Sequence, residues 1–428
     1  MKSEKIINIL IVEKFDVVIV GAGPAGLIAA GRAGELGAKV LVLEKMKKEG
    51  KKLLITGKGR CNITNDSYMS NYFKRIYPNG RFLKYAFSQF FTKDIVDLLN
   101  NNGVETVVER GDRVFPKSNM AVDVLNALLL YAKNNNVLIR RNCNVTKLLI
   151  EDDKIKGVEY RFNNEKRVVQ AKSVILCNGG KSYPATGSTG DGYKLAQAVG
   201  HKVEDVRPAL VPLETKGDIA NKLMGVSLRN SNVVVWVNGK KQKEEFGELL
   251  FTHFGLSGPT ILTLSRFVVD ELIMNNKVEI SIDLKPALNE QKLDNRLIRD
   301  LNDNGKKQIE NIFKLWLPSK MIPVFIDMVK IDPVKVGHQI NAKERGRIKN
   351  LMKNFKLEVS GYRPFKEAII TAGGISTNEI DSKTMESKII NNLYFAGEII
   401  DLDAETGGYN LQIAYSTAWI AGNACAEK

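Results

Sequence analysis

Histidine and cysteine are scarce in this chain, which has three histidines and four cysteines among 428 residues. So few histidines argue against a histidine-rich metal centre, and we expect no bound metal. The cysteines at 61, 143, 177 and 425 form no CxxC pair, which argues against both a zinc site and a disulfide framework. Unpaired thiols are typical of a reducing compartment, so we expect the protein in the cytoplasm.

Long hydrophobic runs are also lacking. No window approaches the roughly 18 apolar residues of a membrane span. Ile6–Val12 is apolar but is interrupted by Asn8, and it is too short for the apolar part of a signal peptide. We therefore expect no membrane partner. Hydrophobic residues make up 44% and charged residues 26% of the chain, which is typical of a globular protein and excludes a disordered one.

Acidic residues are outnumbered, with 48 Asp and Glu against 63 Lys and Arg, for a net charge of +15. Residues 1–205 carry +12, residues 206–360 carry +7 and residues 361–428 carry −4. Two basic runs are conspicuous, Lys45–Arg60 and Lys343–Lys356. Such a balance favours anionic partners such as nucleotides, nucleic acid or acidic membranes, although a charge run is more often a solvated surface.

The apolar pattern predicts an α/β fold. Phe15–Val20 is apolar apart from Asp16, as in a strand buried on both faces of a parallel sheet. A helix is expected over 25–36 and a second strand over 39–43, which completes one βαβ unit of a doubly wound fold. Further buried strands are predicted at 145–150 and 173–177, with a hairpin-like pair at 154–156 and 158–162.

The predicted secondary structure changes in character near residue 206. The run at 233–237 followed by Asn238 and Gly239 is a hairpin signal, and 278–284 alternates like a strand. Helices are then expected over 289–317, 319–330 and 342–354, before α/β character returns with a strand at 368–370. These shifts divide the chain into a first part (1–205), a β-rich insert (206–287), a helical subdomain (288–360) and a C-terminal part (361–428).

Gly21, Gly23 and Gly26 form a dinucleotide-binding fingerprint between the first predicted strand and helix. Gly21 permits the tight turn, Gly23 lets the backbone approach a pyrophosphate, and Gly26 lets helix and strand pack closely. The helix N-terminus then offers free N–H groups to the phosphates. Glu44, at the end of the next strand, is suited to accept hydrogen bonds from the hydroxyls of a ribose.

The C-terminal segment favours FAD over NAD as the resident nucleotide. A strand at 392–396 leads into Gly397 and Glu398, and a second glycine-rich helix N-terminus follows at 406–412. Gly397 permits close approach of the cofactor, and Glu398 is suited to its ribityl hydroxyls. The N–H groups of Gly408–Leu411 are suited to an electron-rich acceptor such as the N1/O2 edge of a flavin.

Seven segments carry a resemblance to a known family. The sequence resembles the aminoacetone-oxidase-like or BaiN-type NAD(P)/FAD-dependent oxidoreductases. The matching segments are Asp16–Ala30, Gly57–Asn65, Gly111–Ser118, Asn178–Tyr193, Leu250–Leu262, Thr371–Ser376 and Leu393–Gln412. They run in family order over nearly the whole chain. One departure is Cys177-Asn178, where the family often has Ala-Thr before the glycine pair.

The resemblance implies a Rossmann-like FAD-binding domain, interrupted by a β-barrel-like insert and a small helical subdomain. It implies a diverse range of substrates. With the motifs above, it yields the following candidate cofactor-binding residues: Gly21, Gly23, Pro24, Ala25, Gly26, Glu44, Lys45, Gly59, Arg60, Cys61, Asn62, Val145, Gly179, Gly180, Gly397, Glu398, Gly407, Gly408, Tyr409, Asn410 and Leu411.

Three residues are candidates for catalysis. A thiol near a cation has a lowered pKa, so Cys61 beside Arg60 is a candidate acid or nucleophile, or else a small side chain packed near the flavin. Arg60 is itself suited to bind an anion. His253 is the histidine best placed by motif to move a proton. The resemblance suggests that Tyr183 faces the substrate.

These features predict an FAD-dependent oxidoreductase that transfers a hydride between flavin N5 and a substrate. The sequence has one clear dinucleotide fingerprint, so we expect NAD(P)H to bind only transiently, as the donor of a reductase. The alternatives are flavin-dependent reduction of a base in RNA, oxidation of a small amine, and a non-catalytic flavoprotein interaction module. RNA is the partner that the two basic runs would serve, because RNA affinity rests largely on contacts of Lys and Arg with phosphates.

Overall fold

The computed structural model describes residues 13–427, and the apolar run Ile6–Val12 lies outside the described residues. The chain divides into two compact units. The first contains residues 1–207 and 370–428, and the second contains residues 208–369. The return to the first unit comes after residue 369 rather than 360, because Ala368 packs with Val211 and Val269 of the second unit.

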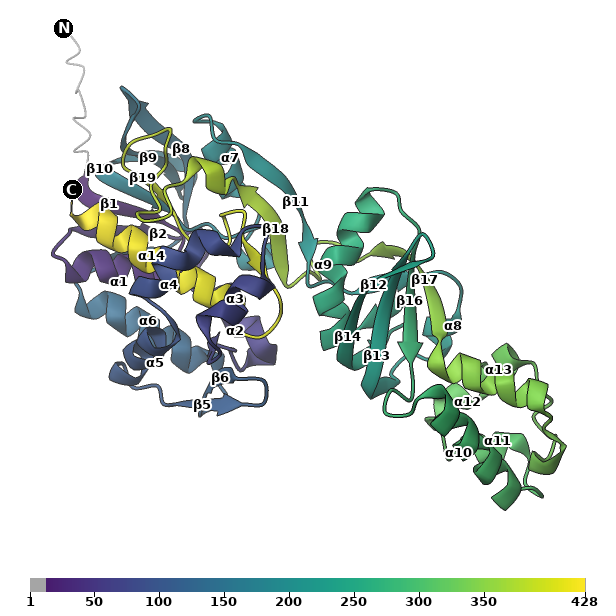
Figure 1. Ribbon diagram of the computed structural model, residues 1–428. Helices are drawn as coiled ribbons and strands as arrows, with labels where there is room; N and C mark the ends of the chain where they lie inside the picture. The colour runs from purple at the N-terminus through teal and green to yellow at the C-terminus, as the bar shows by residue number, and fades with distance from the viewer. Residues whose placement is uncertain (1–12, 428) are drawn as a thin grey trace, which may run out of the picture. The chain divides into compact units, whose positions relative to one another are not determined.

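A doubly wound sheet forms the centre of the first unit (Figure 1), in the strand order β7-β2-β1-β10-β9-β8 with β19 also paired to β10. The bounds are β1 (Glu13–Val20), β2 (Val40–Leu43), β7 (Leu138–Arg140), β8 (Cys143–Glu151), β9 (Lys154–Phe162), β10 (Glu165–Leu176) and β19 (Leu393–Phe395). β1 pairs in parallel with both β2 and β10, and β10 pairs in parallel with β19. The C-terminal part of the chain therefore completes the sheet that the N-terminal part begins, and the predicted Rossmann-like class is confirmed.

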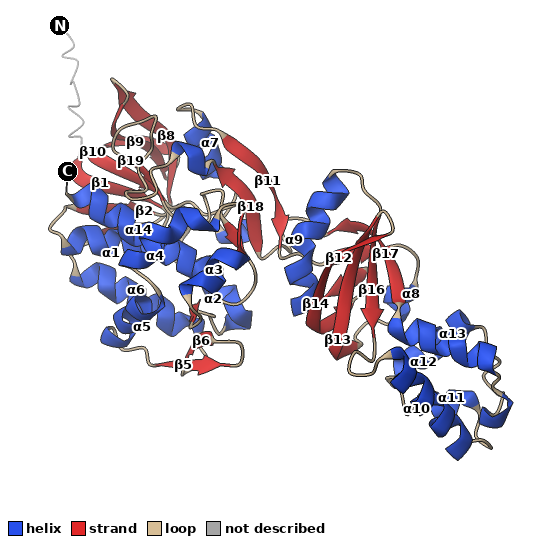
Figure 2. Cartoon of the chain, in the orientation of Figure 1, coloured by secondary structure: helices blue, strands red, loops and turns tan. Residues whose placement is uncertain are grey.

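Helices cover this sheet (Figure 2). The helix α1 (Pro24–Glu35) packs against α14 (Tyr409–Ala426), where a Cβ at Gly422 would lie 2.8 Å from the carbonyl oxygen of Ala29. The other helices of this unit are α2 (Lys51–Ile55), α3 (Met69–Arg75), α4 (Lys84–Gln89), α5 (Thr92–Asn101), α6 (Ala121–Asn134) and α7 (Asp191–Gln197). Small residues thus bring the first and last helices of the unit into close contact.

Short strands lie beside the main sheet. They are β3 (Thr64–Asn65), β4 (Ile76–Tyr77), β5 (Thr106–Glu109), β6 (Arg113–Pro116), β11 (Val203–Ala209), β18 (Ile370–Ile375) and β20 (Asp403–Ala404). Two predictions are wrong here. The expected hairpin within 154–162 is the single strand β9, which continues through Gly157 at φ +146°. The strand expected at 368–370 is β18, which is formed by the TAGGI segment itself and pairs with β11.

A closed six-stranded barrel forms the core of the second unit, in the order β12-β15-β14-β13-β16-β17. The bounds are β12 (Leu213–Thr215), β13 (Ser227–Val237), β14 (Lys240–Phe251), β15 (Gly255–Ser257), β16 (Val278–Asp283) and β17 (Phe355–Tyr362). The helices of this unit are α8 (Ile219–Lys222), α9 (Pro259–Ile273), α10 (Glu290–Asp303), α11 (Ile309–Phe313), α12 (Ile322–Val329) and α13 (Ala342–Lys353). The helical subdomain is therefore inserted between the last two barrel strands, and both share one hydrophobic core.

No helix within residues 13–427 combines the length and apolar character needed to cross a lipid bilayer. All four cysteines are buried and free.

Candidate active site

The glycine fingerprint lies where β1 ends and α1 begins. A Cβ at Gly26 would lie 1.9 Å from the carbonyl oxygen of Gly21, so only glycine permits this approach of helix to strand. A Cβ at Gly23, the residue that caps α1, would meet no protein atom within 4 Å. The structure therefore gives Gly26 its predicted packing role and leaves space at Gly23, in front of the N–H groups of the helix.

Glu44 lies beside this turn, at the carboxyl end of β2. Its two carboxylate oxygens accept hydrogen bonds from the backbone N–H groups of Ala22 at 2.8 Å and Met46 at 2.7 Å. Burial raises the pKa of Glu44, and the two amide hydrogen bonds oppose that rise. Each oxygen keeps a second lone pair, so the carboxylate can still accept from the hydroxyls of a ribose.

Lys45 is held by residues of the segment that opens α7. Its Nζ lies 2.5 Å from both Thr189 Oγ1 and Asp191 Oδ2. Burial disfavours the charged form of Asp191, but hydrogen bonds from Lys45 and Thr189 outweigh it and lower the pKa of that carboxyl. Lys45 therefore links two predicted cofactor segments through a protein carboxylate.

Glu398 is the centre of a polar network that the sequence did not indicate. Its carboxylate accepts from Lys52 Nζ at 2.6 Å, from Ser182 Oγ at 3.1 Å and from the N–H of Thr371 at 2.9 Å. Thr371 Oγ1 accepts in turn from the N–H groups of Lys181 and Ser182. Four segments that are distant in the sequence are joined at this carboxylate. The sequence analysis did not single out Ser182 or Thr371. The only signal for these two residues was that each lies in a segment that resembles the family.

Gly407 and Gly408, at the start of α14, lie in close contact with β3. A Cβ at Gly408 would lie 2.3 Å from the carbonyl oxygen of Thr64, so β3 crosses directly over this helix N-terminus. The side-chain amide of Asn65 donates to the carbonyl oxygens of Gly407 at 3.1 Å and Gly111 at 2.9 Å. Asn65 therefore connects the segment Gly111–Ser118 to the helix that is predicted to face the flavin.

The residues that follow Gly408 offer backbone N–H groups to a cofactor. The side chain of Asn410 is occupied, because it exchanges hydrogen bonds with the N–H and the carbonyl of Ala404. The first-turn N–H groups of α14 at Tyr409, Asn410 and Leu411 have no partner within the helix, as at any helix start. Gly397, at φ +80°, would place a Cβ 2.9 Å from the Cβ of Ala25, so it brings the C-terminal segment against α1.

The structure contradicts one prediction for Cys61. Its side chain is fully buried, and burial raises its pKa to about 12, so the predicted lowering of the pKa is wrong. Arg60 does not activate the thiol, because its guanidinium pairs with Glu109, bonds Asn119 and lies over the ring of Phe115. The same contacts occupy the group that was expected to bind an anion. Cys61 itself adopts a left-handed backbone at φ +60°.

Two buried oxygens next to these motifs lack partners. Asn62 Oδ1 and Asn178 Oδ1 accept no hydrogen bond from any described residue. A buried unpaired acceptor is costly, and a ligand that carries donors removes that cost. With the space at Gly23 and the carboxylate of Glu44, these oxygens fit a bound dinucleotide, and we expect FAD to supply the missing donors.

The remaining candidate residues for cofactor or substrate contact lie in several parts of the first unit. A Cβ at Gly180 would lie 2.5 Å from Thr371 Oγ1, so this glycine makes room for the Glu398 network. Gly179 and Tyr183 have left-handed backbones, at φ +69° and φ +50°. Val145 is buried in β8 opposite Tyr160. Their contacts with cofactor or substrate stay predictions, as does the contact of Gly59.

His253 belongs to the second unit. Its side chain is exposed, and its ring packs edge-on against Phe254 with the centroids 4.9 Å apart. Arg363 lies over the other ring of this pair, that of Phe254, and forms ion pairs with Glu214 and Glu367. His253 therefore lies exposed in an aromatic and charged surrounding, and its proton-transfer role stays a prediction.

The second basic run, 343–356, is partly paired with carboxylates of its own unit. Arg345, Lys349 and Lys353 each lie within ion-pair distance of a carboxylate from α10 or from the end of β16. These pairs attach α13 to its neighbours. These three residues therefore help to hold the helical subdomain together, and the RNA contact expected of the run stays a prediction.

Comparison with known proteins agrees with this geometry. The family described as HI0933-like protein Rossmann domain matches residues 15–424. A ribosomal RNA dihydrouridine synthase of Escherichia coli is 30% identical over 423 residues, which cover 97% of this chain and 98% of that protein. A 3-dehydro-bile acid delta(4,6)-reductase of Clostridium scindens is 29% identical over 412 residues, covering 96% and 98%.

Among solved structures, a 3-ketosteroid delta1-dehydrogenase of Sterolibacterium denitrificans superimposes with a TM-score of 0.53 at 14% identity. The match covers 97% of this chain and 100% of that one. At this identity the likeness concerns the fold alone.

Proposed function

The chain belongs to the HI0933-like Rossmann family of FAD-dependent oxidoreductases, and on that premise we propose that it reduces a uracil ring in ribosomal RNA. The observation that carries the proposal is the match to the Escherichia coli ribosomal RNA dihydrouridine synthase, which spans both compact units. A match of this extent includes the barrel and the helical subdomain as well as the nucleotide-binding motifs.

The reaction is the saturation of one carbon–carbon double bond. In uracil the C5=C6 bond is conjugated to the C4 carbonyl, so a hydride adds at C6 and a proton at C5. FAD held at this site would, when reduced, supply the hydride. We propose NAD(P)H as the transient source of those electrons, so uridine, NAD(P)H and a proton yield dihydrouridine and NAD(P)+.

The chain's own residues position the cofactor and supply the proton. The first-turn N–H groups of α14 offer a positive helix end to the electron-rich edge of the flavin. The Glu398 network holds the loop at 178–183 against the start of β18. Tyr183 and His253 are the candidate proton donors. Cys61 is fully covered and keeps its proton, so we assign it a packing role beside the flavin.

A small-molecule substrate is the second candidate. The bile acid reductase relative acts, by its name, on a dehydro compound at its delta(4,6) positions. A double bond conjugated to a ketone accepts hydride and proton in the same way as uracil does. RNA is favoured because the net charge of +15 exceeds what the two phosphates of FAD call for. The free buried thiols support a reducing compartment such as the cytoplasm.

The test uses unmodified ribosomal RNA transcribed in vitro, incubated with the FAD-loaded protein and NADPH without oxygen. We expect dihydrouridine in the digested RNA by mass spectrometry, at one or a few positions. Parallel reactions without protein, and with protein freed of FAD, separate flavin-mediated transfer from direct chemical reduction by NADPH. RNA without dihydrouridine, alongside efficient reduction of a conjugated ketosteroid, would overturn the RNA proposal in favour of the second candidate.

A further inference from the structure

In segment 44–60 the acidic side chains are buried, whereas several basic side chains are exposed. Its two carboxylates turn inward: Glu44 accepts backbone N–H groups, and the buried Glu49 pairs with Arg141. Three lysines, Lys47, Lys48 and Lys58, are exposed. None of the three has a carboxylate within ion-pair distance among residues 13–427. We call these three residues the lysine face.

Other lysines of the same segment serve the interior. Lys45 pairs with Asp191, and Lys52 pairs with Glu398 at 2.6 Å with its side chain only 20% exposed. The run is therefore divided between lysines that hold the predicted cofactor loops and the lysine face, which no carboxylate of the described residues neutralises. Charge that remains unpaired at the surface is available to an external anion.

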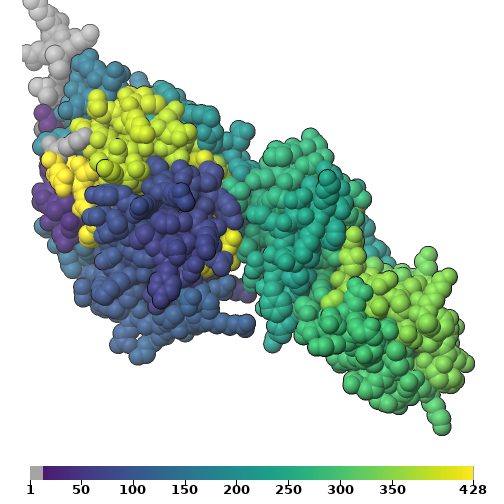
Figure 3. Space-filling view, in the orientation of Figure 1, coloured from purple at the N-terminus to yellow at the C-terminus, as the bar shows by residue number. Residues whose placement is uncertain are grey.

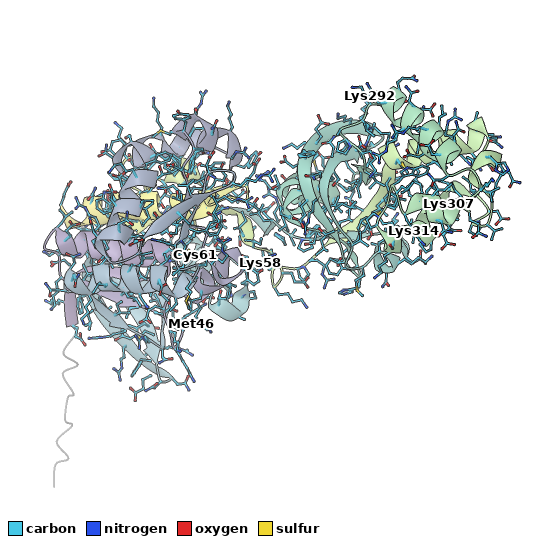
Figure 4. All side chains as sticks on the ribbon, turned by 90° about the horizontal axis from the view of Figure 1, so that it is seen from below. Met46, Lys58, Cys61, Lys292, Lys307 and Lys314 are labelled. Atoms are coloured by element: carbon cyan, nitrogen blue, oxygen red, sulfur yellow. The ribbon has the colours of Figure 1, made fainter. Side chains whose placement is uncertain are left out.

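The lysine face begins at the ligand-binding edge of the sheet. Lys47 and Lys48 follow the carboxyl end of β2, and in open α/β sheets ligands bind outside the carboxyl ends of the strands. The segment that follows Gly50, coloured dark purple and blue, forms part of the surface of the first unit (Figure 3). Lys58 and Cys61 of this segment, and Met46 shortly before it, are labelled in Figure 4.

Lys58 is held in an unusual conformation. It lies between the exposed Gly57 and Gly59 with a left-handed backbone at φ +59°, a region that a residue with a side chain adopts only at some cost. It is three residues from the buried Cys61, whose neighbour Asn62 carries an unpaired buried oxygen. An unpaired cation is therefore displayed at the tip of the loop that leads into the predicted flavin site.

We propose that the lysine face is the surface on which the phosphate backbone of RNA docks, next to the base that enters the flavin site. Unpaired lysines at a ligand-binding edge match the spaced negative charges of a polynucleotide, which is recognised largely through Lys and Arg contacts to phosphate. This inference rests on the proposed function and deepens it, since it names the segment that holds the RNA substrate.

The test compares two triple variants of the full-length, FAD-loaded protein. One replaces the lysine face (Lys47→Gln, Lys48→Gln, Lys58→Gln). The control replaces three other exposed lysines of the first unit, which also have no carboxylate within ion-pair distance in the described chain (Lys84→Gln, Lys133→Gln, Lys154→Gln). Binding of in vitro transcribed ribosomal RNA is measured across a salt series, with FAD occupancy read from the absorbance spectrum.

We expect the lysine-face variant to keep its FAD and to lose RNA affinity at low salt. The slope of log K against log salt should become shallower by about 2, as for three lost phosphate contacts on single-stranded RNA. The control should keep the wild-type slope. Equal slopes in all three proteins, or equal losses in both variants, would overturn the docking surface.

Two further readings separate this inference from the proposed function. If wild-type protein forms dihydrouridine and the lysine-face variant does so with unchanged affinity and KM, the function stands and the docking surface fails. If the lysine-face variant loses affinity for phosphatidylglycerol vesicles while RNA binding is unchanged, the face serves an anionic membrane and the inference is overturned. Absence of dihydrouridine with wild-type protein concerns the function alone.

Discussion

Gly23 and Gly26 lie within one turn of each other, yet a side chain at each would meet opposite surroundings. At Gly26 a Cβ would overlap the carbonyl oxygen of Gly21, and at Gly23 it would meet no protein atom. Gly26 is therefore required by the fold, whereas Gly23 is required only if a ligand occupies the space in front of α1.

The pair allows binding to be separated from folding. Gly26→Ala should lower the free energy of unfolding by about 2 kcal/mol or more, because the backbone must shift to admit the methyl group. Gly23→Val should change the free energy of unfolding by no more than about 1 kcal/mol and should abolish FAD retention. Thermal unfolding of the apo proteins and flavin absorbance after gel filtration measure both effects. A Gly23→Val protein that stays yellow would refute the fingerprint assignment.

Cys61 leads to a prediction about pH. Burial raises its pKa to about 12 from an ordinary value near 9, so the thiol stays protonated in the folded protein at neutral and mildly alkaline pH. We expect iodoacetamide to leave Cys61 unlabelled from pH 7 to about pH 10. Labelling followed by peptide mass spectrometry tests this, with the urea-unfolded protein as the positive control. Rapid labelling of the folded protein at pH 7 would restore the nucleophile hypothesis.

Helices and strands that a local pattern specifies can be predicted from the sequence, whereas those that depend on distant pairing cannot. The strand at 15–20 and the hairpin at Asn238-Gly239 are visible in the sequence, because a continuous apolar run and a turn dipeptide specify them. β17 was hidden, because its place in the barrel depends on pairing with β12 and β16, which lie far away in the sequence.

The candidate site shows the same division. The glycine motifs could be found from the sequence, because their spacing has a local backbone cause. The pairing of Lys52 with Glu398 could not, because 346 residues separate them and neither residue signals the other. The predicted helix over 289–317 is divided into α10 and α11 by a loop that contains Asn304 and Gly305, two residues that favour the ends of helices.

The position of β17 leads to a prediction for fragments. Residues 208–369 are contiguous and enclose their own hydrophobic core, so this fragment should fold alone and unfold cooperatively on heating. A fragment of residues 208–353 lacks β17, which exposes the edges of β12 and β16 and opens the barrel. We expect it to aggregate or to lack a cooperative transition in circular dichroism. Similar melting of both fragments would show that β17 is dispensable.

At the scale of the whole molecule, the net charge of +15 resolves into parts with different roles. Arg345, Lys349 and Lys353 of the run at 343–356 pair with carboxylates of their own unit, and Lys45 and Lys52 hold the predicted cofactor loops. The lysine face has no carboxylate within ion-pair distance in the part of the chain that the structure describes. Other exposed lysines are also unpaired, so the lysine face is distinguished by its place, after the carboxyl end of β2 and in the loop that leads into the predicted flavin site.

We propose that reduced flavin on this protein passes its electrons to uracil in ribosomal RNA. The direct measurement is a single turnover without oxygen. The bound FAD is reduced with light or dithionite, freed of excess reductant, and mixed with unmodified ribosomal RNA while the flavin absorbance is followed. We predict reoxidation of the flavin with a matching yield of dihydrouridine. A flavin that stays reduced with RNA, yet is reoxidised by a conjugated ketone, would contradict the account.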